Sequence, residues 1–371
     1  MFSIKKHRVQ LLMLAVILVA ALAVGACGGG GNTPAPEPAP APAPAPAPET
    51  GGSDPVVDLG DPVDLKLGHL FPITDFRGES MQHFADLCAE YSDGNINITV
   101  FPANTLTTSQ DALKSTASGI ADIAMGALSF NVGEVPALAP LDLAGIYDPD
   151  YFWETYEVIK PVLDKIFATQ NQRNLLVFDE QHSCFYVNSR NAREVHSPAD
   201  IQGLRLRDHG MWIGKSIANW GASPQTVTPA DIAVALDRGT VDGGYTGWSF
   251  LTAYNLTESV PYLSFTKLSK SCWSPMNINL DVWNSLSPAQ QEIMLRAAAD
   301  AMEYGKAITP VEDGLIQAAE AAGGYYYYLT KEENQAFVDL SMNLLDECRE
   351  YSGELGNELI DALLSAPSNY R

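Results

Sequence analysis

The sequence predicts an α/β protein that folds into two lobes. From about residue 63 onward, strand-like stretches alternate with helix-like stretches, which is typical of βαβ units and a mainly parallel sheet. The foldable part is long for a single hydrophobic core, so two are expected. In addition, the segment GIAD at 119–122 is echoed by GTVD at 239–242. In both, a glycine ends a helix and an aspartate lies early in the next strand, which indicates two lobes built on one plan.

Alternating and helical hydrophobic patterns define the elements of the first lobe. Period-two stretches predict its strands, and stretches with apolar residues at helical spacing predict its helices. The strands are expected at 64–69, 96–101 and 120–127, and the helices at 77–91, 108–118 and 148–170. Glycine or a Ser-Asp-Gly turn follows the first two helices and supports these ends.

Two long extended stretches, 174–188 and 266–280, are expected to cross between the lobes. A capping box, SPAQ at 287–290, opens a helix of about twenty residues. The other elements expected after residue 188 are helices at 211–220 and 229–238, a strand at 325–329 and a final helical stretch from 330. The first lobe is predicted to hold 63–184 and 274–312, and the second 185–273 and 313–371.

The first residues are typical of a lipoprotein signal peptide, predicted at 1–26. Basic residues precede an unbroken apolar run at 11–24, which is short for a membrane span. The run leads into VGAC, which resembles a bacterial lipobox with Cys27 as the lipidated residue. Residues 27–62 are then rich in Ala and Pro, favour extended polyproline II and cannot bury a core. The interpretation is a folded domain tethered outside the cytoplasm, in the periplasm or on the outer face of the cell membrane; an ordinary signal peptide cleaved elsewhere is the alternative.

Charge and cysteine content narrow the function further. The chain has a formal net charge of −23, which disfavours nucleic acid as a partner because phosphates need a basic face. Besides Cys27 there are Cys88, Cys184, Cys272 and Cys348, and none are spaced as C-x-x-C. A zinc site or redox pair is therefore not expected. The four can pair as disulfides, for example Cys88 with Cys348 and Cys184 with Cys272, or stay buried as small apolar groups.

The segment SPADIQGLRLR at 197–207 carries the strongest candidate binding residue. Ser197, Pro198 and Asp200 are typical of a capped helical turn, and Gly203 can take the left-handed conformation that ends it. Arg207 then stands at the carboxyl end of a short strand, where open α/β sheets bind ligands. We hypothesise that it holds the carboxylate of a small organic acid; a surface or ion-paired arginine is the alternative.

Several segments, in order along nearly the whole foldable part, resemble the solute-binding proteins of tripartite ATP-independent periplasmic (TRAP) transporters, of the dicarboxylate-binding type. No single motif is decisive; the resemblance rests on the order in which the motifs follow one another along the chain. The matching segments are LKLGH at 65–69, FPANTL at 101–106, GIAD at 119–122, PAL and LDL at 136–143, SPADIQGLRLR at 197–207, GTVDG at 239–243, and WNSLSP at 283–288 with Gln291.

The resemblance implies a two-lobed, periplasmic-binding-protein-like fold with crossing hinge strands and a long helix spanning both lobes. It also implies that Arg207 is the carboxylate-binding arginine and that membrane subunits of a TRAP transporter are partners. A guanidinium meets a carboxylate with two parallel charge-assisted bonds, a geometry lysine cannot supply. The candidate walls and hydrogen-bond donor of the pocket are Phe71, Phe130, Tyr186, Tyr245, Thr246 and Trp248.

Two departures from the family pattern bear on the ligand. The stretch 183–187 lacks the second arginine that many relatives carry, and 244–248 has aromatic residues where many have Asn or Glu-Trp. A two-arginine site and a metal held by a glutamate there are therefore not expected, and no cofactor is. The replacements favour a monocarboxylate with an apolar or aromatic body.

Two other functions remain open from the sequence. One is a solute-binding lipoprotein of another transporter class, with a sugar or peptide ligand, which would depend on aromatic stacking rather than on an arginine. The other is an extracellular enzyme. No G-x-S-x-G, H-E-x-x-H or catalytic-cysteine context is present, although paired carboxylates are compatible with so acidic a chain.

Overall fold

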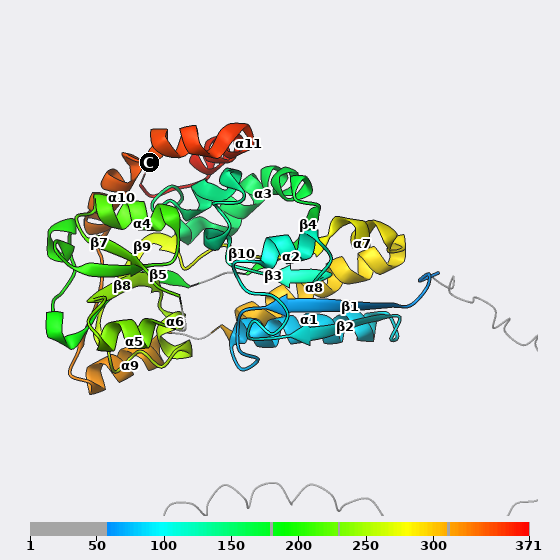
Figure 1. The fold of residues 1–371 in the computed structure, drawn as a ribbon, viewed down its shortest axis with the longest axis horizontal. Coiled ribbons are helices and arrows are strands. Elements are labelled where there is room, and N and C mark those ends of the chain that lie inside the picture. Colours follow the sequence, from blue (N-terminus) through cyan, green and yellow to red (C-terminus); the bar gives the residue numbers. More distant parts are fainter. Residues whose placement is uncertain (1–57, 179–180, 229–230, 310–311, 371) are drawn as a thin grey trace, which may run out of the picture. The chain divides into compact units, whose positions relative to one another are not determined.

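Two mixed β-sheets organise the chain in the computed structural model, which describes residues 58–178, 181–228, 231–309 and 312–370. The predicted signal peptide, Cys27 and most of the predicted tether lie outside these residues. Figure 1 shows the two sheets with helices around each. The first has the order β2-β1-β3-β10-β4 and the second β11-β9-β5-β8-β6-β7. This is the two-lobed α/β architecture that the sequence predicts.

The first sheet consists of β1 (Val63–His69), β2 (Ile96–Phe101), β3 (Ile123–Met125), β4 (Gln172–Phe178) and β10 (Ser274–Asn279). Strands β1, β2 and β3 are parallel, whereas β10 is antiparallel to both β3 and β4. The prediction of a mainly parallel sheet is therefore wrong in part. The strands that cross between the sheets run against the βαβ units, which makes both sheets mixed.

The second sheet consists of β5 (His182–Val187), β6 (Arg205–Asp208), β7 (Ser223–Thr226), β8 (Gly243–Gly247), β9 (Tyr262–Lys270) and β11 (Tyr325–Tyr328). Consecutive strands pass from one sheet to the other at three places: from β4 to β5, from β9 to β10, and, by way of helices α7 to α9, from β10 to β11. Each of the two predicted long extended stretches is thus a pair of strands, one in each sheet.

Helices cover the sheets and fill the space between them. They are α1 (Phe76–Tyr91), α2 (Ala112–Ala117), α3 (Phe152–Thr169), α4 (Met211–Asn219), α5 (Ile232–Asp237), α6 (Ser249–Ala253), α7 (Leu280–Ser285), α8 (Pro288–Ile308), α9 (Asp313–Ala321), α10 (Lys331–Met342) and α11 (Leu345–Ser365). Helix α8 packs on α1 and β4 of the first sheet, and α9 packs on β11 of the second. The helical stretch after residue 287 therefore reaches both sheets.

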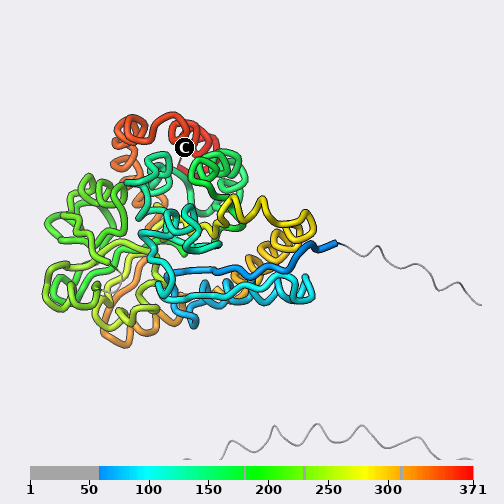
Figure 2. Tube along the Cα trace, turned by 45° about the vertical axis from the view of Figure 1, so that its right-hand side comes forward, coloured from blue at the N-terminus to red at the C-terminus, as the bar shows by residue number. Residues whose placement is uncertain are grey.

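Short 3-10 helices connect these elements: η1 (Leu128–Phe130), η2 (Pro136–Asp142), η3 (Pro149–Tyr151), η4 (Ser189–Asn191) and η5 (Pro198–Ile201). The C-terminal helix α11 packs on η2 and α3, and both views show its red ribbon beside α3 (Figures 1 and 2). One hydrophobic cluster joins η2, α3 and α11 and includes Trp212 of α4.

The sequence echo corresponds to one local structure in each sheet. Gly119 and Gly239 both have positive φ and end the helices before β3 and β8. The carboxylate of Asp122 accepts from the backbone N–H of Lys66 in the middle of β1 (2.8 Å), and that of Asp242 accepts from the N–H of Arg205 at the start of β6 (2.9 Å). Each aspartate thus fixes the strand whose far end faces the candidate site.

The cysteines in the described part of the chain lie in its interior. Cys88, Cys184, Cys272 and Cys348 are all buried, and no disulfide joins any two of them. The disulfide pairing considered from the sequence is therefore absent, and the alternative of small apolar groups in the core holds. Burial raises the pKa of the Cys348 thiol to about 11, so it stays neutral.

Candidate functional site

Strand β6 presents Arg207 at its carboxyl end, as the sequence predicts. The turn before it, η5, has the predicted capping box, and Gly203 has positive φ. At the start of the strand, Arg205 forms a bidentate ion pair with Asp242, with distances of 3.0 and 2.7 Å. Arg205 is half exposed, whereas Arg207 is only 1% exposed. Arg205 and Arg207 are two positions apart and so lie on the same face of β6. Arg205 is paired near the surface, whereas Arg207 is buried.

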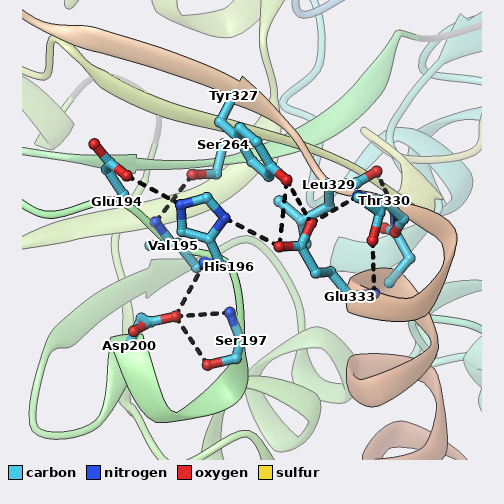
Figure 3. Close-up of polar contacts among 11 residues, drawn as sticks. Glu194, Val195, His196, Ser197, Asp200, Ser264, Tyr327, Leu329, Thr330 and Glu333 are labelled. Atoms are coloured by element: carbon cyan, nitrogen blue, oxygen red, sulfur yellow. Dashed lines mark hydrogen bonds and ion pairs between the residues drawn. The ribbon is translucent and has the colours of Figure 1, made fainter.

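A polar network anchors the segment that leads into β6 (Figure 3). The carboxylate of Asp200 accepts from the backbone N–H groups of His196 (3.0 Å) and Ser197 (2.7 Å). The His196 ring contacts Glu194 at 3.1 Å and Glu333 of α10 at 3.0 Å. This network ties the approach to β6 to an element more than a hundred residues further along the chain.

Arg207 is buried with part of its guanidinium unpaired. Its Nε donates to the carbonyl of Val227 at 3.0 Å, and its Nη1 has no hydrogen-bond partner among the described residues. Burial lowers the pKa of Arg207, but a guanidinium stays protonated in proteins. A buried cation with an unused donor is costly unless an anion meets it.

The Tyr186 hydroxyl lies close to Arg207 and is also unpaired. The two side chains meet at Gly244, where a Cβ atom would stand 2.3 Å from Tyr186 Oη and 3.0 Å from Arg207 Cβ. Tyr186 Oη is buried without a partner in the part of the chain that the structure describes, and burial raises its pKa to about 12. Two buried side chains, each with a polar atom that has no partner among the described residues, therefore flank Gly244.

Arg207 lines a small, largely apolar cavity, which we call the arginine cavity. It is lined by Leu70, Phe71, Ala127, Phe130, Arg207, His209, Thr246, Phe250, Ser271 and Cys272. Its volume of about 10 Å³ is room for about one water molecule. An organic acid therefore enters only if the walls, which come from both sheets and from η1, move apart.

The sequence-predicted residues divide into two groups. Phe71, Phe130 and Thr246 line the arginine cavity with Arg207, and Tyr186 lies beside them. Tyr245 and Trp248 do not line it. Tyr245 packs on Phe185 and Trp220 and contacts Thr266 and Ser269 through its hydroxyl at 3.1 Å. Trp248 lines a different cavity.

Arg77 contributes to the site, although no local pattern marks it beyond the start of a helix. It is fully buried, forms a bidentate ion pair with Asp75 (2.7 and 2.9 Å), and places its guanidinium carbon 3.7 Å from the centroid of the Phe71 ring. It therefore fixes a wall of the arginine cavity rather than opening into it. Phe250, Ser271 and Cys272 were also missed, because no local pattern marks them.

The two histidines near the site are neutral. His209 lines the cavity, and burial followed by the nearby Arg207 charge lowers its pKa to about 3. His69, at the end of β1, is fully buried with both ring nitrogens unpaired, and burial lowers its pKa to about 4. Arg207 is therefore the one cationic side chain among the cavity's described lining residues.

The part of the chain that the structure describes holds neither a cluster of metal-ligating side chains nor a helix suited to crossing a membrane. No group of three or more His, Cys, Asp or Glu side chains within 58–178, 181–228, 231–309 and 312–370 is arranged to hold a metal ion. Over the same ranges, no helix combines the length and apolar character that crossing a bilayer would need.

The fold has two mixed β-sheets, covered by helices and joined by crossing strands. A buried arginine at the end of a strand faces a cavity between them. This combination defines a solute-binding protein of the periplasmic type. The chain belongs to the bacterial extracellular solute-binding protein family 7, the DctP family, whose model matches residues 67–351. It is thus a TRAP-type extracytoplasmic solute receptor, and the alternative of another transporter class is not supported. The family is one of transport binding proteins.

Individual relatives are distant in sequence but close in fold. The C4-dicarboxylate-binding periplasmic protein DctP of Rhodobacter capsulatus is 22% identical over 322 residues, covering 83% of this chain and 92% of the relative. The pyroglutamic acid-binding solute receptor DctP7 of Bordetella pertussis has a TM-score of 0.72 at 17% identity, over 81% of this chain and 99% of that one. A TRAP solute-binding protein of Roseobacter denitrificans with bound β-D-glucuronate has a TM-score of 0.74 at 20% identity, over 82% and 100%.

Proposed function

We propose that this receptor binds a small organic acid in the arginine cavity and delivers it to the membrane subunits of a TRAP transporter. The observation that carries the proposal is Arg207, which lines the cavity and whose buried Nη1 has no partner among the described residues; the unsatisfied Tyr186 Oη lies with the Arg207 Cβ against Gly244. A carboxylate accepts from both at once and neutralises the arginine. Binding rather than catalysis is the inferred role, because the cavity's polar groups suit holding an anion.

The ligand we infer is a monocarboxylate with an apolar or aromatic body. The cavity wall has one cation, and the remaining lining is mainly apolar, with Phe71, Phe130 and Phe250 as its aromatic members. Thr246, which is nearly buried, can donate to a second oxygen. Binding pockets of this kind combine an apolar lining with a few placed polar groups. The pyroglutamic acid bound by the Bordetella pertussis receptor carries one carboxylate, which agrees with this class.

Closure between two lobes is the mechanism we propose. The lobe boundaries are those expected from the sequence, 63–184 with 274–312 and 185–273 with 313–371, and the crossing strands would act as the hinge. A ligand that touches both lobes favours the closed state by its difference in affinity for the two conformations. We also propose that Cys27 is lipidated and holds the receptor at the membrane, which a Cys27→Ala variant tests by its release from the membrane fraction.

A thermal-shift screen of small organic acids tests the proposed ligand class. At least one monocarboxylate is expected to raise the melting temperature, because a ligand that binds only the native state stabilises it. Arg207→Ala should then weaken that ligand by about 2–5 kcal/mol, since it removes a buried charge-assisted pair. Arg207→Lys should recover only part of the loss, because an ammonium lacks the fork geometry.

Arg205→Lys is the matched control, since Arg205 lies on the same strand but pairs with Asp242 away from the cavity. It is expected to leave ligand affinity unchanged. Stabilisation by neutral sugars alone would overturn the carboxylate proposal. Equal affinities of wild type and Arg207→Ala would remove Arg207 from the site.

A further inference from the structure

A second, larger cavity lies against the crossing segments, and we call it the crossover cavity. Its volume is about 430 Å³, within the range of small-molecule pockets. Its lining includes Gln181, which precedes β5, Lys270 at the end of β9, and Lys306 near the end of α8. It shares no described lining residue with the arginine cavity. Lys270 faces the crossover cavity and the next residue, Ser271, faces the arginine cavity, so one crossing segment borders both.

Gln181 is the least satisfied side chain of the crossover cavity. It is 7% exposed, and neither its amide nitrogen nor its amide oxygen has a hydrogen-bond partner among the described residues. Its backbone is well held, because its carbonyl accepts from the N–H of Ser271 at 2.9 Å. An unpaired buried amide is costly, and the acidic group of a ligand in the cavity can accept from its nitrogen.

Positive charge is concentrated around this cavity in an otherwise strongly acidic chain. Lys267, Lys270 and Lys306 line it, with two carboxylates, Asp150 and Glu312. Both carboxylates are already engaged. Asp150 contacts Lys267 at 2.6 Å, and Glu312 accepts from the Tyr328 hydroxyl at 3.0 Å.

Lys306 is the cation best placed to exchange its partner. Its ammonium lies 4.1 Å from the centroid of the Trp153 ring and 2.7 Å from Glu303, a carboxylate that is 68% exposed. An exposed ion pair of this kind contributes little to stability. A ligand anion in the cavity can therefore replace Glu303 at little cost.

We propose that the crossover cavity is a second binding site, for a small aromatic or apolar organic anion. Lys306 and Lys270 hold its acidic group, the Gln181 amide hydrogen-bonds it, and its body lies against Trp248 and Phe265, which are both nearly buried. This explains Trp248 better than a place in the arginine cavity does. The site is independent of Arg207, so it does not depend on the function proposed above.

Binding of 4-fluorobenzoate to the full-length chain, followed by ¹⁹F NMR and by calorimetry, tests the proposal. An Arg207→Met background removes the arginine cavity as a competing site. In that background we expect saturable binding, weakened about ten-fold or more by Lys306→Met and by Gln181→Leu, each of which deletes one polar contact. The neutral analogue 4-fluorobenzyl alcohol should bind at least about ten-fold more weakly than the acid.

Lys165→Met is the matched control, because Lys165 is an exposed lysine that pairs with Glu358 far from this cavity's lining. It should leave the affinity unchanged. Melting curves show whether each variant is folded. If Gln181→Leu does not fold, Lys306→Met alone tests the site. Absence of saturable binding in the Arg207→Met background overturns the proposal. So does binding that neither Lys306→Met nor Gln181→Leu weakens.

Discussion

The carboxylate of Asp142 accepts a hydrogen bond from the backbone N–H of Trp212 at 2.9 Å, across 70 positions of sequence. The N–H of Ile213 approaches the same oxygen at 3.4 Å. Trp212 is the second residue of α4, whose N-cap is Gly210 and has no side chain to accept these donors. Helix α4 begins directly after the strand that carries Arg207, so Asp142 ties η2 to the segment that presents the arginine.

The buried Asp142 carboxyl predicts that stability falls as pH rises toward neutrality. Burial raises its pKa from 3.8 to about 7. The native state therefore keeps a proton that the unfolded chain has lost between roughly pH 4 and 7, and stability decreases with rising pH across that window. An Asp142→Asn variant has no carboxyl at this position, so its stability lacks this pH-dependent contribution. Urea unfolding at about pH 4 and about pH 7 should show a larger loss of stability in wild type than in the variant; equal losses would contradict the prediction.

Local patterns were enough to predict the framework of the site. The glycines at 119 and 239 and the aspartates three residues later mark the same junction in both sheets, because a positive-φ helix stop is a short-range feature. The strands that the two aspartates contact, through Lys66 and Arg205, lie far back along the chain and are not marked by that pattern. The capped turn and Gly203 before β6 are also local features, and they predicted the strand whose end carries Arg207 to the cavity. The mixed direction of the sheets was not, since pairing between strands depends on long-range topology.

The rest of the site depends on contacts that no local spacing records. Tyr245 and Trp248 belong to the predicted aromatic run, but the structure directs Tyr245 into the core and Trp248 toward the crossover cavity. Arg77 looked like a residue at the start of an amphipathic helix. Its stacking on Phe71 follows from the bidentate pair with Asp75, which holds the guanidinium inside.

The His196 network predicts a second pH effect, on the segment before β6 (Figure 3). Its hydrogen bonds to Glu194 and Glu333 outweigh partial burial and raise its pKa above 6.5. The stabilisation is fully present below about pH 6.5 and is lost as pH rises through the folded-state pKa. Because the ring is partly exposed, His196→Gln should cost only about 0.5 kcal/mol at low pH and less at high pH. NMR titration of the His196 ring and unfolding at both pH values check this; a lowered pKa would refute it.

Arg77→Lys should destabilise the protein more than an exposed arginine substitution does. Lysine loses both the bidentate contact with Asp75 and the stacking on Phe71, and leaves a poorly paired buried charge, at a cost of about 3 kcal/mol. Arg296→Lys is the control. Arg296 also stacks on an aromatic ring, with its guanidinium carbon 4.1 Å from the centroid of Tyr91, but its side chain is 67% exposed. It should cost no more than about 0.5 kcal/mol. Similar losses in urea unfolding would show that the Arg77 pair is not structural.

Gly244→Ala tests whether Tyr186 and Arg207 act together on the ligand. A methyl group there would stand 2.3 Å from Tyr186 Oη, so the tyrosine or strand β8 must shift. Because the carboxylate is expected to accept from both side chains, its affinity should fall about ten-fold or more, measured by calorimetry with the acid found in the screen. Gly133→Ala, where the added methyl meets nothing within 4 Å, should leave the affinity unchanged. Unaltered binding in a folded Gly244→Ala protein would mean that Arg207 holds the carboxylate without the tyrosine, and the two unsatisfied donors would then need separate explanations.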